Sequence, residues 1–120
     1  MGPTLLIVDD REEFCSVAGQ MLASDGFDVT GMVFDGDQAL AFVASHHPDV
    51  VLLDIQLPGM DGFEVARRLA LLPDAPDVVL TSSRSRGSYG HRLAESPVRG
   101  FIPKQDLTGS ALNALIERPA

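Results

Sequence analysis

Five polar side chains stand beside short apolar runs, and their types could bind a hard cation and hold a phosphoryl group. In chain order they are Asp9, Asp10, Asp54, Thr81 and Lys104. Carboxylate oxygens are the ligands that Mg2+ prefers, and a carboxylate can also attack phosphorus. A hydroxyl and an ammonium group can stabilise the charge on phosphoryl oxygens. This chemistry requires a fold that brings the five side chains together.

Asp54 is the least expected of the five, because it ends the apolar run 50–53, which is typical of a strand buried on both faces. The residues that follow it, IQLPGMD, read as a loop that turns at Pro58 and Gly59. No helix is expected to begin close enough for Asp54 to act as its cap. A buried strand that ends in such a carboxylate indicates a functional role.

The other four side chains have ordinary structural explanations when each is taken alone. Asp9 or Asp10 could cap the helix that follows the first strand. Thr81 is of a type common in strands, and Lys104 could be a solvated surface lysine. The functional interpretation therefore depends on all five lying at one place in the fold.

Short apolar runs alternate with amphipathic stretches along the chain, which predicts five strands and five helices. The strands are expected at residues 4–8, 28–33, 49–55, 77–82 and 98–102, and the helices at 11–24, 35–47, 61–72, 88–96 and 107–118. Five such units in order predict one α/β domain with a five-stranded parallel sheet, doubly wound, with helices on both faces. Ligands bind such sheets outside the carboxyl ends of the strands, and the five polar side chains belong to that edge.

The ends of two helices carry further signals. Asp61 is expected to cap the helix at 61–72, with Glu64 as its capping-box partner. The helix at 88–96 is expected to be weak, because Gly87 and Gly90 lower its helix propensity.

The expected cluster of carboxylates is unfavourable unless a cation joins it. Two carboxylates about 4 Å apart at a partly shielded edge repel by about 4 kcal/mol. Mg2+ would relieve this repulsion and leave a coordination position for a phosphoryl oxygen, and Lys104 would add a second positive charge. Asp54 could then attack phosphorus while Thr81 donates its hydroxyl hydrogen. The residues by themselves predict an aspartyl-phosphate site.

Length, charge and cysteine content narrow the possible functions. The 120 residues, 45% of them hydrophobic, fit a single domain spanning 1–120. A formal net charge of −8 argues against direct binding of nucleic acid. Cys15 is the only cysteine, which rules out an internal disulfide and fits a reducing cytoplasm, and we expect it to be buried. The apolar run 5–8 is too short for a signal peptide or a membrane span.

The polar residues lie in motifs that resemble the receiver domain of bacterial two-component response regulators. The matching stretches are LLIVDD, DVVLLDIQLPGMDGFEV, VVLTSS and GFIPK, and the resemblance covers nearly the whole chain. It implies a flavodoxin-like, CheY-like (βα)5 three-layer sandwich. The GFIPK stretch is similar to receivers that precede LuxR-type helix-turn-helix outputs, although no output domain is expected within these 120 residues.

The resemblance also implies a role for each acidic residue. Asp54 would be the phospho-acceptor, Asp10 a direct ligand of Mg2+, and Asp9 a ligand that acts mostly through water. Asp54 and the backbone carbonyl of Gln56 would complete the protein ligands. Mn2+ could take the place of Mg2+.

Three further residues receive roles from the same resemblance. Thr81 would be the switch hydroxyl, and Lys104 would pair with the phosphoryl group. Phe101 would be the aromatic residue that rotates inward on activation, although it lacks the hydroxyl of a tyrosine.

The loop after the fifth strand departs from the family pattern. The family usually has a proline after the lysine, whereas here Pro103 precedes it and Gln105 follows it. The shape of this loop is therefore expected to differ.

A receiver of this kind would be a cytoplasmic signalling switch rather than an enzyme. It would take a phosphoryl group from a histidine kinase or a histidine phosphotransfer protein, lose it by autodephosphorylation, and signal to a downstream output protein or domain. Neither nucleic acid nor membrane is an expected partner, and phosphorylation could promote a dimer. Two alternatives are a phosphorylation-independent interaction module and a small Mg2+-dependent phosphatase. The phosphatase is disfavoured because such enzymes usually need an insert that 120 residues cannot hold.

Four of the nine basic residues fall between the fourth strand and the start of the fifth in an otherwise acidic chain: Arg84, Arg86, Arg92 and Arg99. They form either a solvated face or a partner-binding patch beside the weak fourth helix. We expect phosphorylation to draw Thr81 toward the phosphoryl group, to let Phe101 pack inward, and to shift the fourth helix and the fifth strand.

Overall fold

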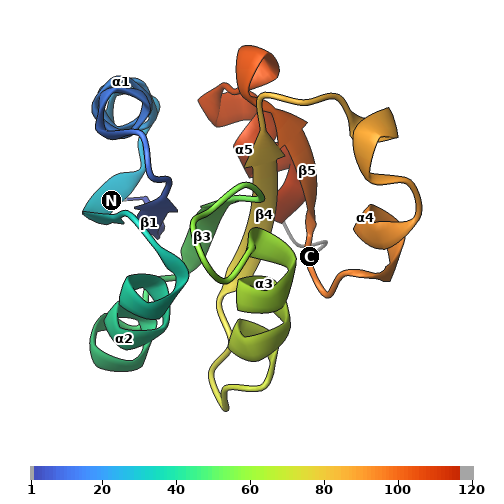
Figure 1. Cartoon of the computed structure of the whole chain (residues 1–120). Helices are drawn as coiled ribbons and strands as arrows, with labels where there is room; N and C mark the ends of the chain where they lie inside the picture. Colours follow the sequence, from blue (N-terminus) through green and yellow to red (C-terminus); the bar gives the residue numbers. More distant parts are fainter. Residues whose placement is uncertain (1, 117–120) are drawn as a thin grey trace.

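The computed structural model describes residues 2–116 and has one five-stranded parallel sheet between two layers of helices (Figure 1). The strands are β1 (Thr4–Val8), β2 (Asp28–Val33), β3 (Val50–Asp54), β4 (Asp77–Ser82) and β5 (Gly100–Pro103). Their order in the sheet is β2-β1-β3-β4-β5. The chain therefore reverses its winding direction between β1 and β3, as in a doubly wound α/β fold. The predicted fold class is confirmed.

The helices cover both faces of the sheet. They are α1 (Glu12–Ser24), α2 (Gly36–His46), α3 (Gly62–Ala70), α4 (Arg92–Glu95) and α5 (Gly109–Ile116), with short 3-10 helices η1 (Arg86–Tyr89) and η2 (Lys104–Asp106). One hydrophobic cluster joins α1 and α5 to one face through residues such as Cys15, Leu22 and Leu112. A second cluster joins α2 and α3 to the other face through residues such as Val43 and Val65.

The central strands are buried on both sides because large apolar residues fill nearly every position. All five residues of β3 are buried, and so are Leu5 to Val8 of β1. The edge strand β2 instead alternates between exposed and partly buried residues, as expected for a strand with one neighbour. Polar side chains at the ends of β1 and β3 therefore follow directly after the buried centre of the sheet.

Two details differ from the sequence-based expectations. The helix predicted at 88–96 is split into η1 and the four-residue α4, consistent with its low helix propensity. Asp61 caps α3 as predicted, since its Oδ1 accepts from the Glu64 backbone N–H at 3.0 Å. The proposed reciprocal bond from Glu64 is wrong, because the Glu64 carboxylate pairs with Arg67 and Arg68 one turn further along α3.

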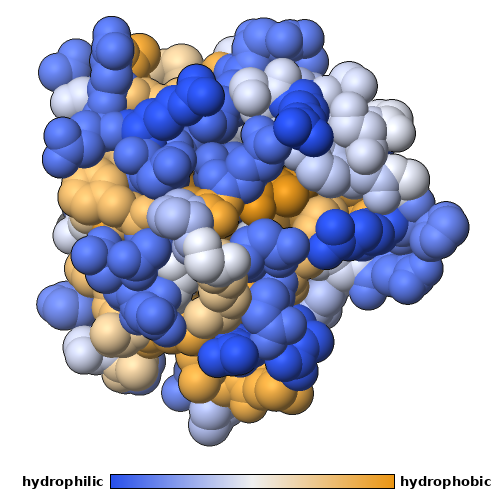
Figure 2. Space-filling model, in the orientation of Figure 1, coloured by the Kyte–Doolittle hydropathy of each residue, from blue (hydrophilic) through white to orange (hydrophobic). Residues whose placement is uncertain are grey.

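The remaining elements lie close to their predicted bounds. Residues 117 and 118, the predicted end of the last helix, lie outside the described residues. Within residues 2–116, no helix is long and apolar enough to cross a membrane. Figure 2 shows hydrophilic residues covering much of one face, with apolar surface visible between them.

Candidate functional site

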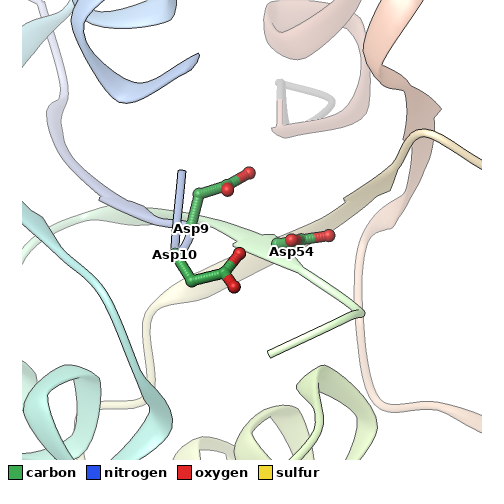
Figure 3. Close-up of side chains that lie close together, drawn as sticks. All are labelled: Asp9, Asp10 and Asp54. Atoms are coloured by element: carbon green, nitrogen blue, oxygen red, sulfur yellow. The ribbon is translucent and has the colours of Figure 1, made fainter. Parts of the chain in front are cut away.

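Three carboxylates converge at the carboxyl edge of the sheet, where β1 and β3 end. Asp9 and Asp10 follow β1, and Asp54 is the last residue of the neighbouring β3 (Figure 3). One carboxylate oxygen from each residue lies within 4.8 Å of the other two. Asp9 and Asp54 are buried, whereas Asp10 is exposed to solvent. The edge therefore concentrates negative charge at the point where the sheet reverses its winding.

The backbone around Asp54 is held by β4 and by the start of α3. Asp54 is paired with Thr81 in the ladder between β3 and β4, and the Ile55 N–H donates to the Thr81 carbonyl at 3.0 Å. After the strand, the loop turns at Gly59, whose φ of 73° suits glycine. The Gly62 N–H then donates to the Ile55 carbonyl at 2.8 Å, which brings the start of α3 against the end of β3.

The two carboxylate oxygens of Asp9 have different surroundings. Its Oδ1 accepts from the Arg11 backbone N–H at 2.9 Å. Arg11 is itself the N-cap of α1, and no side chain caps this helix, so the explanation of Asp9 or Asp10 as a helix cap is wrong. Asp9 Oδ2 is buried and has no hydrogen bond. The Cys15 thiol donates to the Asp9 carbonyl at 3.5 Å, and burial together with the Asp9 charge raises the pKa of Cys15 to about 11. Cys15 is therefore a protonated packing residue, as predicted.

Lys104 bridges the two buried carboxylates. Its Nζ lies 2.7 Å from Asp9 Oδ2 and 3.6 Å from Asp54 Oδ2, so the lysine is nearer to Asp9. The shorter contact is an ion pair without the alignment of a hydrogen bond, since Asp9 Oδ2 has no hydrogen-bond partner. The peptide bond between Lys104 and Gln105 is trans. With Gln105 in place of the usual proline, the lysine still reaches both carboxylates.

The environment of Asp54 raises its pKa from 3.8 to about 6. The main cause is burial, followed by repulsion from the Asp9 carboxylate. Lys104 opposes this rise, and so does the Gln56 backbone N–H, which donates to Asp54 Oδ1 at 3.2 Å. At neutral pH the carboxylate therefore remains mostly ionised. Asp54 therefore carries a negative charge at neutral pH, and a nearby cation would stabilise this charge.

The site fits a hard divalent cation. Asp9 Oδ2 is a buried carboxylate oxygen without a hydrogen bond, and three carboxylates lie within reach of one ion. All of these donors are oxygen atoms, as Mg2+ requires. Lys104 currently supplies the compensating positive charge. The role of the Gln56 backbone carbonyl as a further ligand remains a prediction.

Thr81 and Phe101, the two residues predicted to switch, lie on neighbouring strands. Thr81 is fully buried, and its hydroxyl donates to the Ile102 carbonyl of β5 at 2.7 Å. The hydroxyl is thus engaged with the sheet rather than free to meet a ligand. The Phe101 ring is only 5% exposed, so it already occupies a buried position in this structure. The predicted inward rotation of Phe101 remains a prediction.

Two contacts at the site were not foreseen from the sequence. The Lys104 ammonium lies 4.4 Å from the centre of the Phe14 ring on α1, a cation–π geometry. With its amide oxygen turned toward Arg84, Gln56 accepts from Arg84 Nε at 3.0 Å and from Nη2 at 3.3 Å. Both contacts join residues far apart in the chain, and the sequence carried no signal for either pairing.

Comparisons with known proteins agree with this geometry. Residues 5–116 match the family model described as the response regulator receiver domain. The structure superposes on the signal receiver domain of the response regulator NarL from Mycobacterium tuberculosis with a TM-score of 0.85 and 27% sequence identity. That superposition covers 98% of each chain.

Two longer proteins also share sequence with the chain. The DNA-binding response regulator MtrA of Mycobacterium tuberculosis is 42% identical over 82 residues, which are 68% of this chain and 36% of MtrA. The response regulator PleD of Caulobacter vibrioides is 36% identical over 107 residues, which are 87% of this chain and 23% of PleD. The chain thus spans little more than a third of MtrA and less than a quarter of PleD.

Proposed function

The chain belongs to the response regulator receiver domain family, and from this premise we propose that it accepts a phosphoryl group on Asp54 in a Mg2+-dependent reaction. We propose further that residues 1–120 act as one receiver domain. The observation that carries the proposal is the geometry around Asp54. A buried carboxylate at the end of β3 shares its surroundings with two further carboxylates and with the Lys104 ammonium.

The reacting group is the ionised carboxylate of Asp54. One of its oxygens forms a bond to phosphorus, and the bond between phosphorus and the donor breaks, with its electron pair leaving on the donor. From a small acyl phosphate the leaving group is a carboxylate, and from a phosphohistidine it is the imidazole. Because no proton must first be removed from Asp54, a general base is not needed.

Lys104 and Thr81 would stabilise the phosphoryl group. The Lys104 Nζ at 3.6 Å from Asp54 Oδ2 is close enough to pair with an oxygen of a group attached there. Thr81 would donate its hydroxyl hydrogen to another oxygen, which requires it to leave the Ile102 carbonyl. This exchange of partners would couple the chemistry at β3 to the position of β5.

Mg2+ would be held by Asp9, Asp10 and Asp54, and when bound it neutralises charge on the phosphoryl oxygens. Asp9 is held by the Arg11 N–H through one oxygen and presents the other toward the cluster. Lys104 would then be released from its shorter contact with Asp9 and become available to the phosphoryl group.

Family membership also suggests which proteins would donate the phosphoryl group and which would respond to it. Response regulators exchange phosphoryl groups with histidine kinases, so we propose a sensor kinase or a histidine phosphotransfer protein as donor. The output would be read by a downstream protein or domain through the surface formed by α4, β5 and α5. The DNA-binding activity named for MtrA belongs to that longer protein. This chain, with its net charge of −8, is not proposed to bind DNA itself.

Intact-mass analysis after incubation with acetyl phosphate tests the proposal directly. We expect the protein to gain the mass of one phosphoryl group when Mg2+ is present, and no gain when Mg2+ is chelated. Asp54→Asn should abolish the gain, because an amide cannot form the phosphoryl bond. Asp49→Asn is the matched control, since Asp49 lies outside the cluster at the opposite end of β3.

Two results would contradict the proposal. A phosphoryl gain that persists in Asp54→Asn would place the acceptor elsewhere. No gain in the unmodified protein, with Mg2+ binding shown independently, would favour an interaction module that works without phosphorylation.

A further inference from the structure

Tyr89 is the only tyrosine of the chain, and its hydroxyl meets a buried serine at the end of β4. Tyr89 Oη and Ser82 Oγ are 2.5 Å apart, within hydrogen-bond distance. Ser82 is fully buried, and its Oγ also accepts from the Arg84 backbone N–H at 3.0 Å. The 3-10 helix η1 is therefore tied through its last residue to the last residue of β4.

The same tyrosine covers Phe101. Its ring packs edge-on against Phe63 of α3, with centroids 5.7 Å apart, and against Phe101 of β5, with centroids 6.1 Å apart. Arg86, also in η1, lies with its guanidinium 5.3 Å from the centre of the Phe101 ring. It also donates to the Phe101 carbonyl at 3.2 Å. The segment between β4 and β5 thus holds Phe101 in place from its outer side.

Ser82 is also the covalent neighbour of Thr81. The two side chains point to opposite faces of β4, because side chains alternate along a strand. Thr81 is bonded to the Ile102 carbonyl, and Ser82 is bonded to Tyr89. The Thr81 hydroxyl has a single hydrogen to donate, so it cannot serve the Ile102 carbonyl and a phosphoryl oxygen together. A displacement of Thr81 toward Asp54 would therefore also move the partner of Tyr89.

We propose that the hydrogen bond between Tyr89 and Ser82 is a latch that keeps η1 closed over Phe101, and that phosphorylation of Asp54 opens it. Phe101 has no hydroxyl. The hydroxyl of Tyr89 is the one that connects this aromatic group to the end of β4, through Ser82. The inference rests on the proposed phosphorylation of Asp54. Opening would free the aromatic face of η1 and Phe101 for the rearrangement of the segment between β4 and β5.

The tyrosine provides its own signal, because the chain has no tryptophan. Near-ultraviolet circular dichroism and tyrosine fluorescence should be recorded with acetyl phosphate and Mg2+, with intact mass measured on the same samples. We expect the tyrosine signal to change in step with the phosphoryl gain, and to stay constant in Asp54→Asn. The Ser82→Ala variant should show the altered signal before any phosphodonor is added.

Two conservative variants test whether the hydrogen bond controls the reaction. Tyr89→Phe keeps the ring and removes only the hydroxyl, whereas Ser82→Ala removes both the partner of that hydroxyl and the acceptor of the Arg84 backbone N–H. Tyr89→Phe is therefore the cleaner test. Because one hydrogen bond shifts such an equilibrium about fivefold, each variant should be phosphorylated about fivefold faster. The double variant should be no faster than either single one, since both remove the same bond. Ser88→Ala, an exposed serine in η1, should leave the rate unchanged.

The outcomes separate the latch from the proposed function. A phosphoryl gain with an unchanged tyrosine signal would overturn the latch and leave the proposed function intact. Rates that are unchanged in both single variants, or additive in the double variant, would overturn it as well. Failure of the unmodified protein to gain a phosphoryl group would overturn the proposed function, and the latch as a phosphorylation device with it.

Discussion

The segment between β4 and β5 begins at the edge of the sheet where β3 ends, but the two regions are built in different ways. Asp54 ends a strand in which every residue is buried and in which residues 50–53 are paired with both β1 and β4. The segment 83–99 is mostly exposed and contains only two four-residue helical pieces. Its order depends on side-chain contacts such as those of Tyr89 and Arg86.

This difference separates two requirements of a switch. Groups that react must be held within a narrow range of positions, and central strands provide that rigidity. Groups that change position must sit where opening costs little free energy, and an exposed segment with few buried contacts provides that. Substitutions in β3 should therefore affect stability more than equivalent substitutions in the segment 83–99.

Replacing one leucine in β3 and one in the segment 83–99 by alanine should give the largest difference in stability. Leu53→Ala removes a fully buried side chain beside Asp54 and should lower the free energy of unfolding by about 3 to 4 kcal/mol. Leu93→Ala removes a partly buried side chain from α4 and should lower it by about 1 kcal/mol. Urea denaturation measures both. Equal losses in the two variants would show that the segment is as firmly packed as the centre.

The charge of Asp54 should lower the stability of the metal-free protein. Its pKa is raised from 3.8 to about 6, so between these values the folded protein binds more protons than the unfolded chain. Stability from this group is therefore present below pH 3.8, falls as pH rises, and is fully lost above about pH 6. A pKa difference of about two corresponds to about 3 kcal/mol.

Asp54→Asn should remove this pH dependence, because the amide carries no charge. We expect the variant to match the unmodified protein near pH 3.8 and to exceed it by about 3 kcal/mol at neutral pH. Chemical denaturation across this pH range, with metal chelated, gives the comparison. A variant that is less stable at neutral pH would show that the contact between Asp54 and Lys104 outweighs the cost of burying the carboxylate.

Replacing one glycine in each region by alanine should give a smaller difference in stability between the two regions. A Cβ at Gly62 would meet the Asp54 carbonyl oxygen and lie 2.7 Å from Ile55 Cα, so Gly62→Ala should cost about 2 kcal/mol. A Cβ at Gly87 in η1 would meet nothing within 4 Å, so Gly87→Ala should be neutral or stabilising by up to about 1 kcal/mol. Thermal unfolding of the pair measures the difference. A destabilising Gly87→Ala would indicate that η1 is more tightly constrained than its contacts suggest.

The fold could be predicted from the sequence because its signals are local and agree with one another. Apolar runs at β1 and β3 and amphipathic stretches at α1 and α2 each indicate one element, and their alternation dictates a parallel sheet. The segment around α4 was harder to place, because glycine-rich stretches with weak periodicity allow several short helices. The partner of Glu64 could not be predicted, because two arginines on the next turn compete with the capping-box bond.

The sequence was sufficient to predict which residues of the site lie at strand ends, but not how their side chains pair. Parallel strands align their carboxyl ends, so Asp9, Asp10 and Asp54 could be placed together without coordinates. The pairing of Lys104 with Asp9, the Phe14 ring beneath the lysine, and the contact of Tyr89 with Ser82 could not. They depend on side-chain directions and on how loops fold back, and neither leaves a periodic signal in the sequence.

The edge strand β5 also limits how the protein can associate with itself or with others. It has four residues and ends in Pro103, which lacks a backbone N–H. A short strand of this kind offers little backbone to a foreign strand, so growth of the sheet by addition of another chain is disfavoured on this side. Partners that approach β5 must recognise its side chains rather than an open backbone edge.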